Sequence, residues 1–273
     1  MLINFLKMHG LGNDYIYVFD TGLDCDWAKL TTVLSRPHFG IASDGLILIS
    51  KSQVADFRMR IFNIDGSEAE MCGNGIRCTG KFLYDMGYTD CTNLTIETLG
   101  GIKKLQLTVH DKKVSSIKVE MGTVLVSEKQ TLTVAGQKVT GYPVNVGNPH
   151  FVVFVDNVEK TDVAYLGPLL EKHPFFPNKT NVEFVEILND TTIKIRVWER
   201  GVYETNACGT GATASAVAAI TLGYTDPQNT TVCLRGGDLH ISYNLETKEA
   251  IMTGSATTVF KGSFETKDFD TTA

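Results

Sequence analysis

The sequence has no apolar run that approaches the uninterrupted length of a membrane-spanning helix. Its first ten residues include Asn4, Lys7 and His9 and lack the apolar core and small-residue cleavage site of a signal peptide. There is no excess of basic charge either, because 25 Lys and Arg against 31 Asp and Glu give a formal net charge of -6. Nucleic acids and anionic membranes are therefore poor partners for this chain. We expect a cytoplasmic protein whose partner is a small molecule.

Cysteine pairs of the kind that hold a structural metal are also missing. No two of the cysteines stand in a C-x-x-C pattern, so we expect no metal site. In a cytosolic chain of this size most of them should be free thiols. The six cysteines are Cys25, Cys72, Cys78, Cys91, Cys208 and Cys233.

What the sequence does contain is an internal repeat. Residues 72–75 (Cys-Gly-Asn-Gly) and residues 208–211 (Cys-Gly-Thr-Gly) each precede a helical run. At the same offset Gly-Tyr-Thr-Asp occurs twice, at 87–90 and 223–226, as does a Gly-Gly pair, at 100–101 and 236–237. The dipeptide Gly-Asn at 12–13 matches 147–148 one residue off that spacing. So many matches indicate a duplicated unit.

The repeat also predicts the fold class. With 273 residues, 43% apolar and 21% charged, the chain suits two ordinary globular domains. Strand-like segments in each half surround one central helix, predicted over 76–86 and 212–222, with shorter helices over 27–34 and 166–173. Gly87 is the expected C-terminal cap of the first central helix. In the second half we expect the first strand over 138–146. No Pro- or Ser-rich linker marks a boundary. We place it by the repeat, between residues 121 and 122, and predict a mixed α/β (α+β) chain of two similar units.

Each unit places one cysteine at the mouth of a helix. The flanking glycines let the backbone turn tightly, and the free N–H groups and dipole of the helix N-terminus favour an anion there. A thiol in that position is expected to have a lowered pKa. One such cysteine could equally be a buried structural residue beside a turn. Two in matching copies favour a functional interpretation.

Three kinds of chemistry use thiols in this way. A cysteine hydrolase needs one thiolate and a base, and gives no reason for a second matched cysteine. A thiol–disulfide enzyme keeps its pair close in sequence, which this chain does not. Inversion of a stereocentre needs a base on one face of a carbon and an acid on the other. The duplicated cysteine fits this third chemistry, with the helix N-termini stabilising the carboxylate that gains charge.

Four segments resemble the signatures of the diaminopimelate epimerase family. They are residues 7–15 (KMHGLGNDY), 63–78 (from Asn63 through Arg77-Cys78), 147–150 (GNPH) and 199–211 (ERG through the second cysteine motif). The resemblance spans almost the whole chain in the family's order. It implies an epimerase that needs no pyridoxal phosphate or other cofactor and interconverts LL- and meso-diaminopimelate, in lysine and peptidoglycan synthesis. It also implies two domains, each an antiparallel barrel-like sheet around a central helix: 1–121 with a returning C-terminal segment of about 263–273, and 122–262.

The resemblance further implies roles for particular residues. Cys72 and Cys208 would be the paired acid and base. The carboxylate cradle would consist of Gly73, Asn74, Gly209 and Thr210. The other polar groups of the substrate would be read by Asn13, Asn63, Asn148, Asn181 and Arg200, while His150 and Glu199 would be auxiliary groups near the thiols and the reacting amine. Tyr203 departs from the family pattern, because a small residue is expected there, and it should alter the packing of its loop.

Alternatives remain for single residues and for the whole chain. Asn63 and Asn181 could each be turn or strand-end residues, and Arg200 with Glu199 could be a solvated pair that contributes little. Relatives with the same two-domain frame racemise other amino acids, such as histidine. A non-catalytic amino-acid-binding protein is a third interpretation. Oligomeric state is open, with a homodimer among the options.

Overall fold

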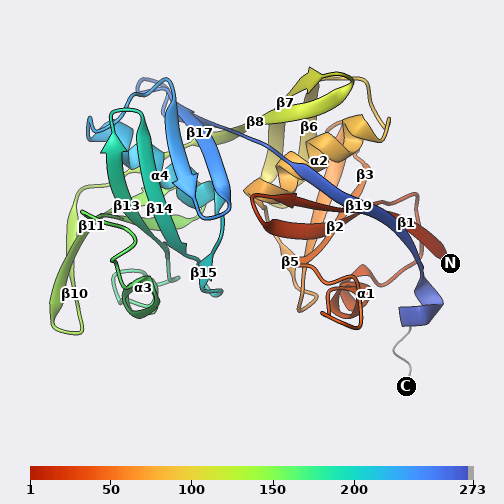
Figure 1. The fold of residues 1–273 in the computed structure, drawn as a ribbon, viewed down its shortest axis with the longest axis horizontal. Helices are drawn as coiled ribbons and strands as arrows, with labels where there is room; N and C mark the ends of the chain where they lie inside the picture. Colours follow the sequence, from red (N-terminus) through yellow and green to blue (C-terminus); the bar gives the residue numbers. More distant parts are fainter. Residues whose placement is uncertain (270–273) are drawn as a thin grey trace. The chain divides into compact units, whose positions relative to one another are not determined.

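The computed structural model describes residues 1–269 and divides into two compact units (Figure 1). The first combines Met1–Val119 with the segment from Ser255 onward, and the second is Glu120–Gly254. The boundary predicted between 121 and 122 lies inside strand β8 (Lys113–Thr123), which continues from one unit into the other. A repeat can locate two copies, but it cannot show that one strand is shared between them.

The sheet of the first unit is antiparallel except at two pairs. Strands β2 and β3 are parallel, as are β4 and β6. Parallel neighbours need a long crossover, and helices α1 (Trp27–Leu34) and α2 (Gly73–Asp85) lie in those connections. The strands are β1 (Leu2–Gly10), β2 (Asn13–Phe19), β3 (Gly45–Lys51), β4 (Phe57–Asn63), β5 (Glu68–Ala69), β6 (Asn93–Thr98), β7 (Gly101–His110), β8 and β19 (Thr257–Glu265).

The second unit has the same order of pairings. Its parallel pairs are β12–β13 and β14–β16, and helices α3 (Val163–Glu171) and α4 (Gly209–Thr221) lie in the crossovers. The fold class predicted from the repeat is confirmed, with these parallel pairs as an added detail. The strands are β9 (Leu125–Val126), β10 (Gln130–Val134), β11 (Gln137–Asn145), β12 (Pro149–Phe154), β13 (Asn181–Asn189), β14 (Thr192–Trp198), β15 (Glu204–Thr205), β16 (Thr230–Leu234), β17 (Gly237–Tyr243) and β18 (Glu249–Gly254).

The C-terminal part of the chain returns to the first unit earlier than expected. Strand β19 pairs antiparallel with β1 over almost its whole length, and the short helix η1 (Thr266–Phe269) follows. The return therefore begins at Ser255, not at about 263. Pairing with β19 also satisfies backbone groups of β1 that an edge strand would leave open. The end of the predicted segment, residues 270–273, lies outside the described residues.

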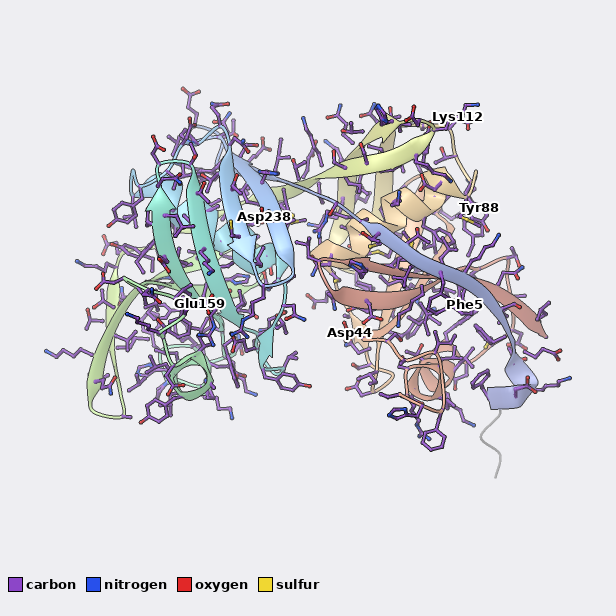
Figure 2. All side chains as sticks on the ribbon, in the orientation of Figure 1. Phe5, Asp44, Tyr88, Lys112, Glu159 and Asp238 are labelled. Carbon is purple, nitrogen blue, oxygen red and sulfur yellow. The ribbon has the colours of Figure 1, made fainter. Side chains whose placement is uncertain are left out.

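The central helices are buried within their own units. Almost every residue of α4 is buried, as its run of small and apolar side chains predicted. Helices α1 and α3 pack their apolar faces on the sheets. In the first unit Trp27, Leu30 and Leu34 join a core that includes Phe5 (labelled in Figure 2) and Phe62. Complete burial of one such side chain contributes about 1.5–3 kcal/mol.

Both central helices end at a glycine. Gly87 and Gly223 each have a φ of 76°, a left-handed conformation that glycine adopts without strain. The next N–H, of Tyr88 or Tyr224, donates back into the last turn at 2.9 Å, which is the Schellman arrangement. The cap predicted at Gly87 is confirmed. The helices start three residues earlier than predicted, because the cysteines themselves are the N-caps. Within residues 1–269 no helix is long and apolar enough to cross a membrane.

Candidate active site

The two motif cysteines occupy equivalent positions at the central helices. Cys72 caps α2 and Cys208 caps α4, with extended backbones of φ −135° and −124°. Each Sγ accepts a hydrogen bond at 3.3 Å from the third N–H along, that of Gly75 or Gly211. Sulfur thus replaces the oxygen of an ordinary N-cap residue. The helix dipole and the first-turn N–H groups make each mouth a favourable place for an anion.

In the first unit Asn13 contacts the thiol. Its Oδ1 lies 3.4 Å from Cys72 Sγ and 3.5 Å from Asn74 Nδ2. Its Nδ2 donates to the carboxylate of Asp44 at 2.8 Å, and that carboxylate also accepts from the N–H of Asp14 at 3.0 Å. The predicted residues Asn13, Cys72 and Asn74 are therefore brought together. Asp44, labelled in Figure 2, was not predicted; nothing in its local sequence separates it from an ordinary turn residue.

Arg77 supports this cluster from inside the unit. Its guanidinium is fully buried and donates to the carbonyl of Gly73 at 3.0 Å and to Asn74 Oδ1 at 2.9 Å. Its Nε donates to the carbonyl of Ser255 at 3.1 Å. Because Arg77 occupies Oδ1 of Asn74, the amide nitrogen is directed toward Asn13. Arg77 lies within the motif at residues 63–78, but no feature of its local sequence indicates this orienting role.

Asn63 ends strand β4 and bonds locally. Its side chain donates to Ser67 Oγ at 3.0 Å, and its backbone N–H donates to the Ser67 carbonyl at 2.8 Å. These contacts match the turn interpretation of Asn63. Its role as a substrate reader stays a prediction.

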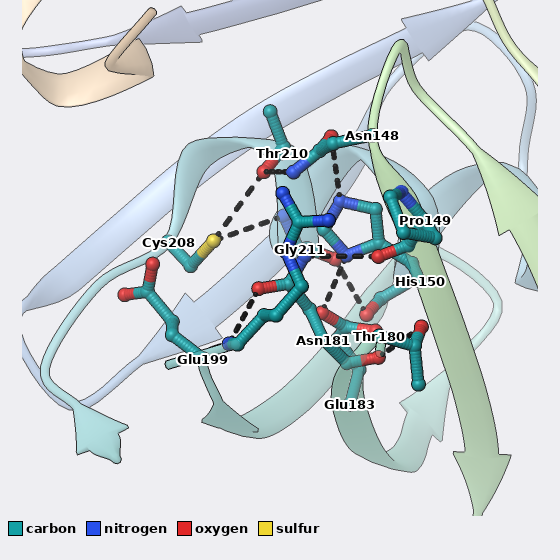
Figure 3. A network of polar contacts seen from close by, with 12 residues as sticks. Asn148, Pro149, His150, Thr180, Asn181, Glu183, Glu199, Cys208, Thr210 and Gly211 are labelled. Carbon is teal, nitrogen blue, oxygen red and sulfur yellow. Dashed lines mark hydrogen bonds and ion pairs between the residues drawn. The ribbon is translucent and has the colours of Figure 1, made fainter. Parts of the chain in front are cut away.

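In the second unit a chain of polar contacts ends on the thiol (Figure 3). Cys208 Sγ lies 3.4 Å from the hydroxyl of Thr210, which accepts from Asn148 Nδ2 at 3.5 Å. Asn148 Oδ1 lies 3.0 Å from His150 Nε2. The opposite ring nitrogen, Nδ1, lies 2.7 Å from Glu183 Oε1. The structure thus brings together four predicted residues and adds Glu183, which was not predicted because it lies mid-strand among apolar residues.

Asn181 fixes the backbone around the predicted substrate readers. Its Nδ2 donates to the carbonyl of Pro149 and its Oδ1 accepts from the backbone N–H of Arg200, both at 2.9 Å. The Arg200 side chain is exposed and donates to the carbonyl of Asn178 at 3.3 Å. Asn181 therefore links the two loops that carry Asn148 and Arg200.

Glu199 and Cys208 have unusual electrostatic surroundings. Burial raises the pKa of Glu199, and hydrogen bonds with Thr205 and Cys208 partly oppose that shift. Burial also raises the pKa of Cys208 well above its ordinary value, and the carboxylates of Glu199 and Glu183 raise it further. The lowered pKa expected for a thiol at a helix mouth is therefore wrong for Cys208. Desolvation and two nearby acids outweigh the helix dipole there.

Tyr203 does not bury its ring in the loop. The side chain is 65% exposed, and its carbonyl accepts from the backbone N–H of Glu199 at 3.0 Å. The expected change in loop packing is thus not a matter of filling space inside the site. Gly73 and Gly209 are the first residues of α2 and α4, directly at the helix mouths. Among residues 1–269 no three His, Cys, Asp or Glu side chains gather in a way that could hold a metal ion.

Known proteins resemble this chain in sequence and in fold. A profile described as diaminopimelate epimerase matches residues 5–126 and 142–259. A diaminopimelate epimerase of Methanococcus maripaludis (strain C6) is 49% identical over 278 residues, covering 96% of this chain and 100% of the relative. One of Parabacteroides distasonis is 48% identical over 262 residues, covering 95% and 97%.

Two solved structures share the fold at low identity. A PhzF-family phenazine biosynthesis protein of Bacillus anthracis superimposes with a TM-score of 0.74 at 18% identity, covering 97% of this chain and 99% of that one. A hydroxyproline epimerase from Agrobacterium vitis has a TM-score of 0.72 at 16% identity, covering 96% and 92%. At such identities the likeness concerns the fold alone.

Proposed function

The chain belongs to the diaminopimelate epimerase family of isomerases, and we propose that it interconverts LL- and meso-diaminopimelate without pyridoxal phosphate. Cys72 and Cys208 are the proposed acid and base. The observation that carries this proposal is the matched pair of N-cap thiols, each 3.3 Å from a glycine N–H at the start of a buried central helix. Such a reaction belongs to lysine and peptidoglycan synthesis, in the cytoplasm.

The proposed reaction moves one proton off the α-carbon and another onto it. One sulfur is a thiolate and takes the α-proton, so that a C–H bond breaks and an S–H bond forms. The electron pair spreads into the α-carboxylate, where N–H groups at a helix N-terminus stabilise the charge. The other thiol then donates its proton to the opposite face of the carbon and becomes the thiolate. The reverse reaction uses the same groups in exchanged protonation states.

The raised pKa of Cys208 supports a particular resting state. At neutral pH this sulfur keeps its proton before substrate binds, so Cys208 is poised to act as the acid. The thiolate form becomes accessible when the substrate's ammonium group approaches Glu199, because a cation beside that carboxylate offsets its effect on the sulfur. Glu199 therefore couples binding of the amine to the protonation of Cys208.

Arg200 supports the choice of a substrate with a second charged end. Its exposed guanidinium is a planar fork of donors that matches a carboxylate. Its backbone is held by Asn181, which also anchors the loop before His150. Together with Asn148 and the predicted readers Asn13 and Asn63, this set suits the distal amino-acid group of diaminopimelate.

Exchange of the α-proton with solvent deuterium tests the proposal. The protein is incubated in deuterated buffer with diaminopimelate, histidine, glutamate or lysine, and the α-proton signal is followed by NMR. Diaminopimelate should lose its signal fastest and interconvert its isomers. Faster deuteration of histidine or lysine would instead assign the chain to a racemase of another amino acid. Binding with no exchange of any substrate would indicate a non-catalytic amino-acid-binding protein.

A further inference from the structure

The residues beneath the two thiols differ between the units. A Cβ added to Gly75 would meet the terminal methyl of Ile47 at 2.6 Å, whereas a Cβ added to Gly211 would meet Oε1 of Glu183 at 2.8 Å. Ile47 and Glu183 therefore occupy the same place under their helix mouths. The second unit has a carboxyl group where the first has a hydrocarbon.

Glu183 and His150 form a fully buried pair. Both side chains are 0% exposed, and Nδ1 lies 2.7 Å from Oε1. Oε2 of Glu183 has no hydrogen-bond partner among residues 1–269. A buried pair with net negative charge is costly, so the pair holds two protons. Burial also raises the pKa of Glu183, in the direction that retains a proton.

The positions of these two protons follow from the available partners. One proton lies in the short bridge between Oε1 and Nδ1. A proton on Oε2 would have no acceptor, whereas a proton on Nε2 of His150 can be donated to Asn148 Oδ1 at 3.0 Å. Nε2 is therefore the protonated position. This agrees with the general rule that the partner of one ring nitrogen sets the state of the other.

A proton on Nε2 sets the donor direction of every hydrogen bond between His150 and Cys208. Asn148 accepts with Oδ1, so its Nδ2 faces Thr210 and donates to that hydroxyl at 3.5 Å. The hydroxyl is then free to donate its own proton to Cys208 Sγ at 3.4 Å. In this arrangement each donor is directed toward the sulfur, along the contacts drawn in Figure 3. Aligned hydrogen bonds of this kind polarise one another.

We propose that Glu183 is a positioning residue that fixes the direction of these hydrogen bonds. The hydrogen bonds in turn stabilise the thiolate of Cys208 when that sulfur must accept a proton. This inference rests on the proposed function and deepens it. Glu183 reaches no substrate in this account. It acts through His150, Asn148 and Thr210, and it distinguishes Cys208 from Cys72, which has Ile47 in the equivalent place.

A purely electrostatic effect of Glu183 would have the opposite sign. Two carboxyl groups act on Cys208 from the strands around α4, Glu183 of β13 and Glu199 directly after β14, and His150 of β12 pairs with Glu183. If Glu183 acted only as a negative charge, removing it would make the thiolate easier to form. If it acts through the chain of donors, removing it makes the thiolate harder to form.

The first test needs no variant of Glu183. Ring nitrogens of the six histidines are observed by ¹⁵N NMR, and His150 is assigned from the signals lost in His150→Gln. At neutral pH Nε2 of His150 should carry a proton, because its neighbour Asn148 Oδ1 is an acceptor. An unprotonated Nε2 would overturn the proposal.

The second test follows alkylation of both thiols by iodoacetamide, resolved by peptide mass spectrometry. Glu183→Gln should slow the reaction of Cys208 roughly tenfold at a given pH, the value of one lost hydrogen bond to an ion. Cys72 serves as the internal standard and should not change. Glu171→Gln is the matched control, because Glu171 is also buried but pairs with Trp198 and the N–H of Gly201. Faster or unchanged alkylation of Cys208 in Glu183→Gln would contradict the proposal.

A double variant separates the chain of donors from general damage. Thr210→Val removes the last donor and should slow alkylation of Cys208 by a similar factor. Adding Glu183→Gln to it should then have little further effect, since the chain is already broken. Additive decreases in the alkylation rate would refute the proposed chain of hydrogen bonds. If Glu183→Gln does not fold, Thr210→Val alone still tests the proposal. None of these measurements uses substrate, so they stand even if diaminopimelate proves not to be turned over.

Discussion

Cys72 and Cys208 cap their helices through the same 3.3 Å contact, yet their neighbours differ. Beside Cys72 lie the amide of Asn13 and, beneath the first turn of α2, Ile47. Beside Cys208 lie Thr210 and Glu199, with Glu183 beneath the first turn. The backbone geometry is alike in the two copies, but carboxyl groups act on Cys208, whereas Tyr15 and Arg77 interact electrostatically with Cys72.

Features away from the thiols show how selective this divergence is. Arg60 pairs with Glu68 in the first unit through two bonds of 2.8 and 2.9 Å. Arg196 and Glu204, at the same offset in the second, pair through bonds of 2.6 and 2.9 Å. Such bidentate pairs hold the short strands β5 and β15 in place. The pairs that support these loops are thus the same in both units, whereas the residues beneath the helix mouths, Ile47 and Glu183, differ.

The largest expected effect would show whether the two thiols are equally necessary. Cys72→Ala and Cys208→Ala should each lower epimerisation by about 10²–10⁴-fold in both directions, because each direction needs one thiolate and one thiol. Rates are measured from LL- and from meso-diaminopimelate with folded protein. The exposed Cys91→Ala variant is the control and should remain active. Near-normal turnover by either active-site variant would exclude the two-base mechanism.

Arg200 has Ile64 as its counterpart at the same offset in the first unit. Arg200→Leu should weaken turnover of diaminopimelate roughly ten- to a hundredfold, the cost of a lost charge-assisted contact of about 1.5–3 kcal/mol. Residual activity on shorter amino acids should fall much less. Ile64→Leu, the matched substitution, should change neither. An equal loss on all substrates would mean that Arg200 has a structural role.

Gly75 and Gly211 provide a comparison of stability. Alanine at either position would crowd the residue beneath the helix mouth, and overpacking of this kind costs about 1–3 kcal/mol. Gly211→Ala should be the more destabilising, because Glu183 is fixed by His150 whereas the terminal methyl of Ile47 can shift. Urea denaturation measures both free energies of unfolding. The reverse order would show that Glu183 is mobile.

The smallest expected effect concerns pH and Glu199. Because burial raises its pKa, the folded protein holds this proton more tightly than the unfolded chain. The resulting stability is complete below the unfolded pKa of about 4.3 and is lost as pH rises through the folded value. The urea midpoint should therefore decrease with pH over that range, and less steeply in Glu199→Gln. Asn63→Gln, at the equivalent non-ionisable position, should keep the wild-type dependence of the urea midpoint on pH. An unchanged dependence in Glu199→Gln would show that Glu199 is not the group responsible.

Much of the fold was predictable because it is local and repeated. Helix α1 has the predicted bounds, and Gly87 caps α2 as expected, since turn and cap chemistry depends on neighbouring residues. Strand β9 has two residues, too few to form a pattern, whereas residues 131–134 of β10 alternate polar and apolar and could have been recognised. The start of the C-terminal return was misplaced because it depends on pairing with β1, at the far end of the chain.

The site was predictable in its motif residues and not in their supports. Asp44, Arg77 and Glu183 contact predicted residues, yet each is separated from them in sequence or buried among apolar neighbours. Asn181 was predicted as a substrate reader, but its two bonds fix the backbone at Pro149 and Arg200. The contacts of Asp44, Glu183 and Asn181 join residues far apart in sequence and cannot be derived from spacing, whereas Arg77 contacts Asn74 within one helix.

By itself the sequence determined the duplication, the two helix-mouth cysteines and the family, because these depend on residue type and order along the chain. The tertiary structure decided the chemical state of Cys208. Its helix position alone would lower the pKa of the thiol, but packing removes water and brings the carboxyl group of Glu199 close, so the pKa is raised instead. Desolvation and the distance to charges on other strands are properties of the folded chain, and they set the electrostatic difference between the two units.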